Sequence, residues 1–365
     1  MRERTLRTDG PPDRAPRSAV AAGLTYLFLA SCPAAVGAGG PELPPAPIPL
    51  RILAPVHGLF YQFTPDAAGG VPAGREVLRV ELSESNVLQF PKGFPAQVEP
   101  LLDFEVTRLQ VSYERGITDA WDLGIEVPFT MLSDGWMDGP ILAVEQFFDK
   151  VKPRRRNEDP YSFAYQLSRN GETILTGDDG TVRLGDVGLT TRYVVDRGTG
   201  GRPTVALRGA LKLPTGDRDH AVGSGTVDVA LGLVADWHVG RWSLWSSGSL
   251  TVPLGDVRDT PGFDTEPVGA GYLELGYSLS RRTRLQCQLA FQSGPFDLEE
   301  TFPETGLPVG PDGALTHHIA QVTPAVSRRL GDGRTLFVGV VQDIHSSERS
   351  ASDATVFAVL KMGLR

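Results

Sequence analysis

The stretch that decides the fold is residues 226–252, TVDVALGLVADWHVGRWSLWSSGSLTV. Apolar residues occupy every second position from Val227 to Trp237, while Asp228 and Asp236 fall on the alternate positions. Side chains of a strand point alternately to its two faces, so this pattern predicts a strand with one apolar and one polar face. After the short connection Val239–Gly240 a second alternating stretch follows, which is typical of two strands joined by a tight turn.

The same alternation recurs along most of the chain and predicts about twelve strands. Each has roughly the ten residues that a tilted strand needs to cross a bilayer. We expect the strands at 76–87, 98–114, 120–131, 184–195, 203–213, 226–238, 241–252, 268–280, 283–292, 317–329, 334–344 and 354–364.

The connections between these strands alternate between long and short. The short ones are 115–119, 196–202, 239–240, 281–282 and 330–333, and the long ones include 132–183 and 293–316. Bacterial outer-membrane barrels have short periplasmic turns and long external loops. Because an open strand edge leaves backbone groups without partners in hydrocarbon, the sheet must close. The sequence therefore predicts an all-β protein, a closed antiparallel transmembrane β-barrel of about twelve strands with a short helix in one long loop.

The polar face of the strands is expected to line the lumen. About twelve strands enclose a space too wide for side chains to fill, so the apolar face is expected to meet lipid. Mixed charges inside can line an open channel, or they can pair across the lumen and block it, and the sequence leaves both possibilities open. The candidates for lining the lumen are Arg79, Glu81, Arg108, Asp122, Glu126, Arg192, Arg208, Lys212, Asp228 and Asp236.

Composition excludes several other classes of protein. Lys and Arg number 35 against 44 Asp and Glu, and the net charge of −9 argues against a nucleic-acid partner. A mean hydropathy of −0.12 is too polar for a multi-helix membrane protein. Cys32 and Cys287 alone cannot build a disulfide framework. Cofactor and metal motifs are absent from the sequence, so we expect neither kind of group.

The N-terminus reads as an export signal. Five arginines within residues 1–18 precede an apolar run at 19–30 and small residues at 34–38. This order predicts a signal peptide over 1–38 that is cleaved after Ala38. Lipidation of Cys32, in the sequence Leu-Ala-Ser-Cys, is the alternative. Residues 39–75 are then expected to form a periplasmic N-terminal segment, and residues 76–365 the outer-membrane barrel.

The long segment 132–183 holds the one helical pattern, because Trp136, Val144 and Phe148 recur at helical spacing. A basic cluster follows this pattern. If the cluster lies outside, it can bind the phosphates of lipopolysaccharide, and inside it can favour anions. A solvated loop is the simpler alternative. The cluster consists of Lys150, Lys152, Arg154, Arg155 and Arg156.

Three phrases resemble a known family. They are residues 113–129 (YERGITDAWDLGIEVPF), 184–189 (LGDVGL) and 211–217 (LKLPTGD). They resemble a bacterial family of outer-membrane barrels named domain of unknown function 3187, and in style they are similar to porin-like proteins of aromatic-degradation operons. The resemblance implies outer-membrane lipid, lipopolysaccharide and the barrel-assembly machinery as partners, and it implies no activity. Such barrels usually end in an aromatic residue, whereas this chain ends in Met362-Gly-Leu-Arg365.

One arrangement raises the possibility of an enzyme. Asp343, His345 and Ser347 alternate and so share one strand face, as an acid, a base and a nucleophile would in a lipid hydrolase. That face is opposite to the apolar one, where lipid would be, so we expect no enzyme. The sequence favours an exported porin-like passive channel or a structural barrel in the bacterial outer membrane. A barrel-embedded hydrolase and a soluble periplasmic β-sandwich that binds a ligand are the alternatives, and no subunit contact is indicated.

Overall fold

A computed structural model describes residues 44–89, 98–147, 162–169, 172–199, 201–255, 264–297, 318–331, 333–344 and 354–364. The predicted signal peptide, Cys32, the basic cluster 150–156, His345 and Ser347 all lie outside these residues.

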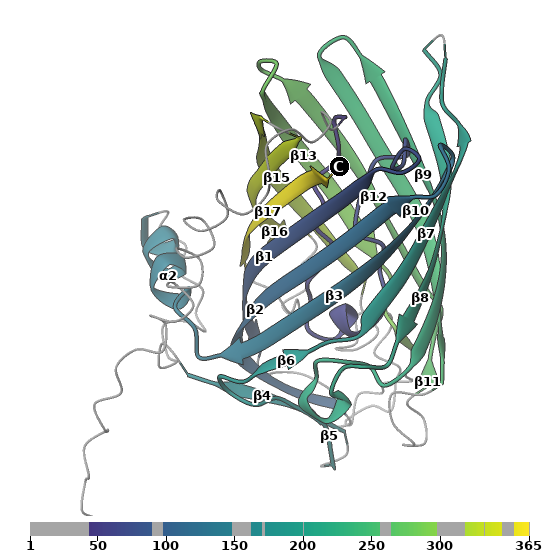
Figure 1. Ribbon diagram of the computed structural model, residues 1–365. Coiled ribbons are helices and arrows are strands. Elements are labelled where there is room, and N and C mark those ends of the chain that lie inside the picture. Colours follow the sequence, from purple (N-terminus) through teal and green to yellow (C-terminus); the bar gives the residue numbers. More distant parts are fainter. Residues whose placement is uncertain are drawn as a thin grey trace, which may run out of the picture. The chain divides into compact units, whose positions relative to one another are not determined.

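Twelve antiparallel strands form a closed ring (Figure 1). The first and last strands pair from Glu76 opposite Leu364 to Asn86 opposite Ala354, which leaves the ring without an edge. The predicted closed barrel is confirmed, and the alternative of a β-sandwich is wrong. In ring order the strands are β1 (Glu76–Gln89), β2 (Val98–Gly116), β3 (Trp121–Ser133), β7 (Val187–Asp196), β8 (Thr204–Leu213), β9 (Val227–Val239), β10 (Trp242–Leu254), β12 (Val268–Ser278), β13 (Thr283–Gln292), β15 (Ile319–Gly331), β16 (Arg334–Asp343) and β17 (Ala354–Leu364).

The hairpin of β9 and β10 shows how the local sequence sets the register. Val239 pairs with Trp242, so the turn contains two residues. Gly240 has a φ of 59°, a backbone conformation that glycine adopts without a steric penalty. We call the end of the barrel that carries this turn and the other short connections the short-turn end.

The long segment between β3 and β7 has more structure than its sequence predicts. The helix is confirmed as α2 (Asp138–Phe147), with Asp138 in its first turn. Three further strands extend the wall beyond the ring: β4 (Ala164–Arg169) pairs with β2, β5 (Glu172–Thr176) pairs with β4, and β6 (Val182–Leu184) pairs with β3. The sequence did not predict these three strands, because they are short and their apolar residues alternate irregularly. None of the helices in the described part of the chain has the length and hydropathy that a membrane crossing requires.

Two short helices and one pair of two-residue strands complete the description. A short helix η1 (His57–Leu59) precedes the ring, and η2 (Arg218–His220) lies between β8 and β9. A two-residue pairing joins β11 (Asp264–Thr265) to β14 (Phe296–Asp297).

The two faces of the wall have opposite polarity. Leu231, Leu233 and Trp237 of β9 are 70, 50 and 46 % exposed, whereas the intervening Asp228 and Asp236 are buried. The last strand is an exception, because Phe357 and Val359 point inward and pack against buried residues from the start of the described chain. Part of the interior of the barrel is therefore filled by apolar residues that do not belong to the wall.

That occupant is the chain's own residues 44–75, which we call the interior segment. Figure 1 draws η1, in purple, within the ring of strands. Ile48, Thr64 and Ala68 are completely buried. The sequence led us to expect a periplasmic segment here, whereas most of its described part is buried within the barrel and only Pro44 at its start and its last residues, 72–75, are exposed. Pro47 and Pro49 lack a backbone N–H, so this stretch has little means of joining a sheet.

Candidate functional site

The first part of the interior segment is held by polar side chains of β12 and β13. The backbone N–H of Ile48 donates to both carboxylate oxygens of Glu274, at 2.9 and 3.1 Å. Gln288 donates to the carbonyl oxygen of Ile48 at 3.1 Å, and Gln286 donates to that of Ala46 at 2.9 Å. Both glutamines also donate to Glu274. These side chains take the place of the missing partner strand, because a buried backbone group needs a hydrogen-bond partner.

At its turn the interior segment is held by Lys212 of β8. The ammonium group donates to the carbonyl oxygen of Leu59 at 3.0 Å. It also lies 2.8 Å from Asp186 and 3.1 Å from Asp228, which balance its charge. Gln292 donates to the carbonyl oxygen of His57 close by, at 3.3 Å.

The returning part of the interior segment carries a buried carboxylate, Asp66. Its two oxygens lie 3.1 Å from Arg192 of β7 and 2.6 Å from Lys361 of β17. Arg192 is also paired with Glu114 and Asp122 of the wall, at 2.8 and 3.0 Å. Asp66 therefore links two separated strands, β7 and β17, through the interior segment.

Wall carboxylates bind further backbone N–H groups of the returning part. Asp228 accepts from Tyr61 at 2.8 Å, and Asp236 accepts from Ala68 at 2.7 Å. Asp122 accepts from the N–H of Val71 at 3.0 Å. Wall side chains therefore supply hydrogen bonds to the backbone of the interior segment, and these bonds hold the segment although it has no regular secondary structure beyond η1.

The ten residues singled out as lumen candidates are all buried, with at most 8 % exposed. Seven of them bond to the interior segment, namely Asp122, Glu126, Arg192, Arg208, Lys212, Asp228 and Asp236. Arg79 pairs instead with Glu114 and Glu126 of the wall, and Arg108 donates to Gln110. No hydrogen bond to either carboxylate oxygen of Glu81 is found within the described residues.

Sequence reasoning missed Asp66, Glu274 and Lys361. The positions of Glu274 and Lys361 on the polar faces of their strands were available as a signal. A second signal was the apolar run 46–63, which is too apolar and too proline-rich for a water-exposed linker.

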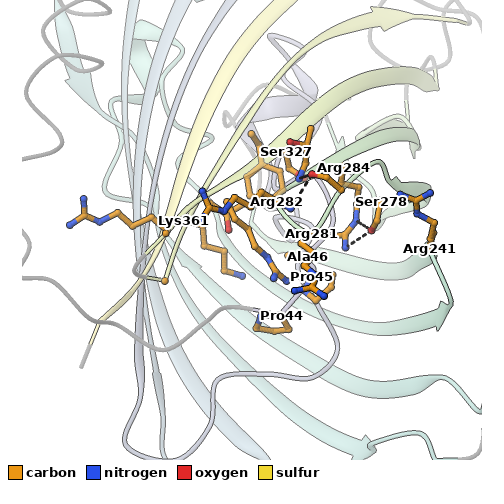
Figure 2. A pocket seen from close by; sticks show the side chains of 18 of the residues that line it. Pro44, Pro45, Ala46, Arg241, Ser278, Arg281, Arg282, Arg284, Ser327 and Lys361 are labelled. Atoms are coloured by element: carbon orange, nitrogen blue, oxygen red, sulfur yellow. Dashed lines mark hydrogen bonds between the residues drawn. The ribbon is translucent and has the colours of Figure 1, made fainter.

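Two cavities border the interior segment. The larger one, of about 770 Å³, lies at the short-turn end and is lined by Pro44, Pro45 and Ala46 together with turns and strand ends of the wall (Figure 2). A smaller one of about 90 Å³ lies between the segment near Arg51 and Tyr61 and the wall residues Phe104, Glu126 and Lys212.

The one described residue of the hydrolase set, Asp343, and a histidine–aspartate pair in a loop lie near the opposite end of the barrel. Asp343 accepts a hydrogen bond from Gln321 at 2.7 Å, and the other two residues of the proposed hydrolase set are outside the described residues. In the connection between β8 and β9, His220 Nδ1 lies 2.6 Å from Asp217. Partial desolvation acts to raise the pKa of Asp217, but the hydrogen bond and charge of His220 outweigh it and lower that pKa.

The chain is similar in structure to an outer-membrane channel of the COG4313 type from Pseudomonas putida F1. The TM-score is 0.51 at 14 % identity, over 81 % of this chain and 98 % of the channel. This likeness shows the barrel fold. A weaker one, with a TM-score of 0.41 at 6 % identity, is to the NanC porin and covers 79 % of this chain and 99 % of the porin.

Two curated relatives match in sequence over a limited stretch, and both are tyrosine–tRNA ligases. Over 132 residues the chain is 31 % identical to a tyrosine–tRNA ligase of Trichormus variabilis, which is 35 % of this chain. The chain spans about a third of the length of this relative, 31 %, and the match leaves most of the barrel uncovered.

The three sequence phrases at 113–129, 184–189 and 211–217 all lie within the match to one family model. The model of that family matches residues 51–309, which include most of the interior segment and nine of the twelve ring strands. The chain belongs to the family described as "Protein of unknown function (DUF3187)".

Proposed function

We propose that this protein is an outer-membrane channel for small solutes, closed in the described state by its own interior segment. Opening requires the segment to shift within the barrel so that water and solute enter. The protein lets small solutes pass through its barrel and performs no catalysis. Outer-membrane lipid, lipopolysaccharide and the barrel-assembly machinery are its expected partners, and an N-terminal signal peptide is expected to export it.

The observation that supports this proposal most strongly is the charged contact between the wall and the interior segment. Asp66, Arg192 and Lys361 are each at least 92 % buried. Burying ions costs several kcal/mol each, and apolar residues of similar volume often stabilise a protein as well or better. A permanently filled barrel could be held by apolar contacts at a lower desolvation cost. Charged groups are useful if the same wall must also face water when the segment moves.

A reversible cross-link tests whether the segment must move. Ala68 of the interior segment and Ala206 of β8 are both completely buried in one apolar cluster. In a Cys287→Ser background, Ala68→Cys with Ala206→Cys should conduct in planar bilayers when reduced and lose its current when oxidised. The control pair Ala210→Cys and Ala230→Cys joins two wall residues that are opposite each other on β8 and β9. Oxidation of this pair should leave the current unchanged.

The cross-linking experiment also distinguishes a channel from a barrel with a purely structural role. A purified barrel that inserts into bilayers and never conducts, reduced or oxidised, would be a structural barrel. Equal currents before and after verified cross-linking of the segment to β8 would show that solute passes without movement of the segment. Recovery of the native protein in a detergent-free periplasmic wash would contradict the outer-membrane location.

A further inference from the structure

The cavity at the short-turn end is built by three neighbouring turns, the strand ends that flank them and the start of the interior segment. The turns are the connections β9–β10, β12–β13 and β15–β16. The first two contribute Arg241, Arg281 and Arg282, and Arg334 begins the strand that follows the third. Arg284 and Arg329 add two more from the adjoining strands. Figure 2 shows Arg281, Arg282 and Arg284 close to Ala46 at the start of the interior segment. We call this cavity the vestibule.

The charge of the vestibule is opposite to that of the chain. Seven of its lining residues are Arg or Lys, and no Asp or Glu lines it within the described part of the chain. Asp332, in the β15–β16 turn, lies outside the described residues. Lys361 is paired with Asp66. If Asp332 and Asp66 are both counted, the seven basic groups still outnumber the acidic ones, in a protein whose net charge is −9.

Four of the vestibule arginines have no acidic partner among the described residues, and two of these four are held in place by other contacts. Arg284 donates to the hydroxyl of Ser278 at 3.2 and 3.3 Å and lies 5.5 Å from the centre of the buried Trp245 ring. Arg241 donates to the carbonyl oxygen of Leu279 at 2.7 Å. Neither of them, nor Arg281 or Arg282, forms an ion pair with a described acidic residue. Several like charges are thus kept together without forming an ion pair with a described acidic side chain.

We propose that the vestibule binds small solutes that carry two or more carboxylate or phosphate groups. Guanidinium groups form paired hydrogen bonds with such oxyanions, and a concave site with one sign of charge concentrates the opposite ion. A volume of about 770 Å³ lies within the range usual for small-molecule sites. The anion would neutralise the repulsion among the arginines. That the bound anion is also the transported solute rests on the proposed channel function, whereas binding itself does not.

Titration calorimetry on the purified full-length barrel in detergent tests this inference. The probes are citrate, inorganic phosphate and, as a neutral control, sucrose. We expect citrate to bind more tightly than phosphate, sucrose to give no heat, and the citrate affinity to fall as NaCl rises, because exposed charges are screened. Absence of citrate and phosphate binding by the folded protein would overturn the proposal.

Two double variants locate the site. Arg281→Gln with Arg282→Gln removes two exposed turn arginines of the vestibule and should weaken citrate binding at least tenfold. Arg197→Gln with Arg202→Gln removes two arginines from another short turn at the same end and should change it less than twofold. Equal weakening in both variants would indicate attraction to the whole barrel end and would contradict a vestibule site.

A half-buried arginine provides a second, independent check. Arg284→Gln should weaken citrate binding and abolish the change in tryptophan fluorescence that citrate causes through Trp245. Retention of wild-type citrate affinity in both this variant and the turn variant would overturn the proposal. Citrate binding to a barrel that never conducts would support the vestibule and count against the channel alone.

Discussion

Lys361 Nζ lies 2.6 Å from Asp66 Oδ1, so the last strand of the barrel is tied to the segment that precedes the first strand. Asp66 is 2 % exposed, and its other oxygen is 3.1 Å from Arg192. One carboxylate thus compensates two cations that project from separate strands. Its removal leaves both of them inside the barrel without this partner.

Asp66→Asn should loosen the interior segment. Removing one member of a buried ion pair typically costs about 3–5 kcal/mol, and here Lys361 loses the carboxylate that it is paired with, while Arg192 keeps Glu114 and Asp122. We expect a lower thermal midpoint by circular dichroism and more frequent or larger openings in planar bilayers. Asp119→Asn is the matched control, since Asp119 contacts the same segment through one exposed hydrogen bond to Ala73. If the two variants behave alike, the Asp66 network does not hold the channel closed.

Glu274→Leu should release the first part of the interior segment. Glu274 accepts from the N–H of Ile48 and from Gln286 and Gln288, so leucine leaves the N–H of Ile48 without an acceptor and removes one of the acceptors of each glutamine. Hydrogen exchange of the Ile48 amide should accelerate at least tenfold, while amides in the centre of β9 stay protected.

Glu274→Gln separates the hydrogen bond from the charge. Glutamine keeps one oxygen acceptor of the same shape, so the exchange rate of Ile48 should change far less than in the leucine variant. Equal acceleration in both variants would mean that the charge of Glu274, and not its hydrogen bond to the backbone, fixes this part.

Leu231→Arg should impair insertion into lipid. Leu231 is 70 % exposed in the middle of β9, where an arginine on the lipid face typically costs about 2–4 kcal/mol. Leu254→Arg is the control, because Leu254 ends β10 and such a charge near the interface costs about 0–1 kcal/mol. Folding yields into vesicles of defined lipid measure both, and equal yields would argue that this face does not meet lipid.

Asp217 should titrate at a lower pH than an ordinary aspartate. Its lowered pKa means that the interaction with His220 contributes stability above the ordinary aspartate range, and that this contribution disappears as the pH falls through the lowered pKa. Carboxyl-carbon NMR of Asp217 measures the midpoint. His220→Ala should raise it, while Arg218→Ala, which removes a charge from the same loop, should have a smaller effect. If the titration midpoint of Asp217 is the same in the His220→Ala variant as in the wild type, the pairing of Asp217 with His220 is disproved.

Much of the wall was predictable from local sequence. The alternation of Val227, Val229 and Leu231 against Asp228 sets the strand and its two faces without reference to any other part of the chain. Gly240 marks a turn by its own conformational freedom. The inward position of the ten polar candidates follows from the same period of two, and all ten are buried.

Local sequence was enough to predict the twelve ring strands, their order and the polar face of most of them, because these features depend on neighbours within a few residues. What fills the barrel, and where the arginines meet, emerges when the chain is folded. Residues 44–75 have no period that points to a partner, and their contacts with Glu274 and Lys361 span more than 200 residues of chain. The vestibule likewise exists because closure of the sheet brings three separate turns to one rim, a proximity that no local pattern encodes.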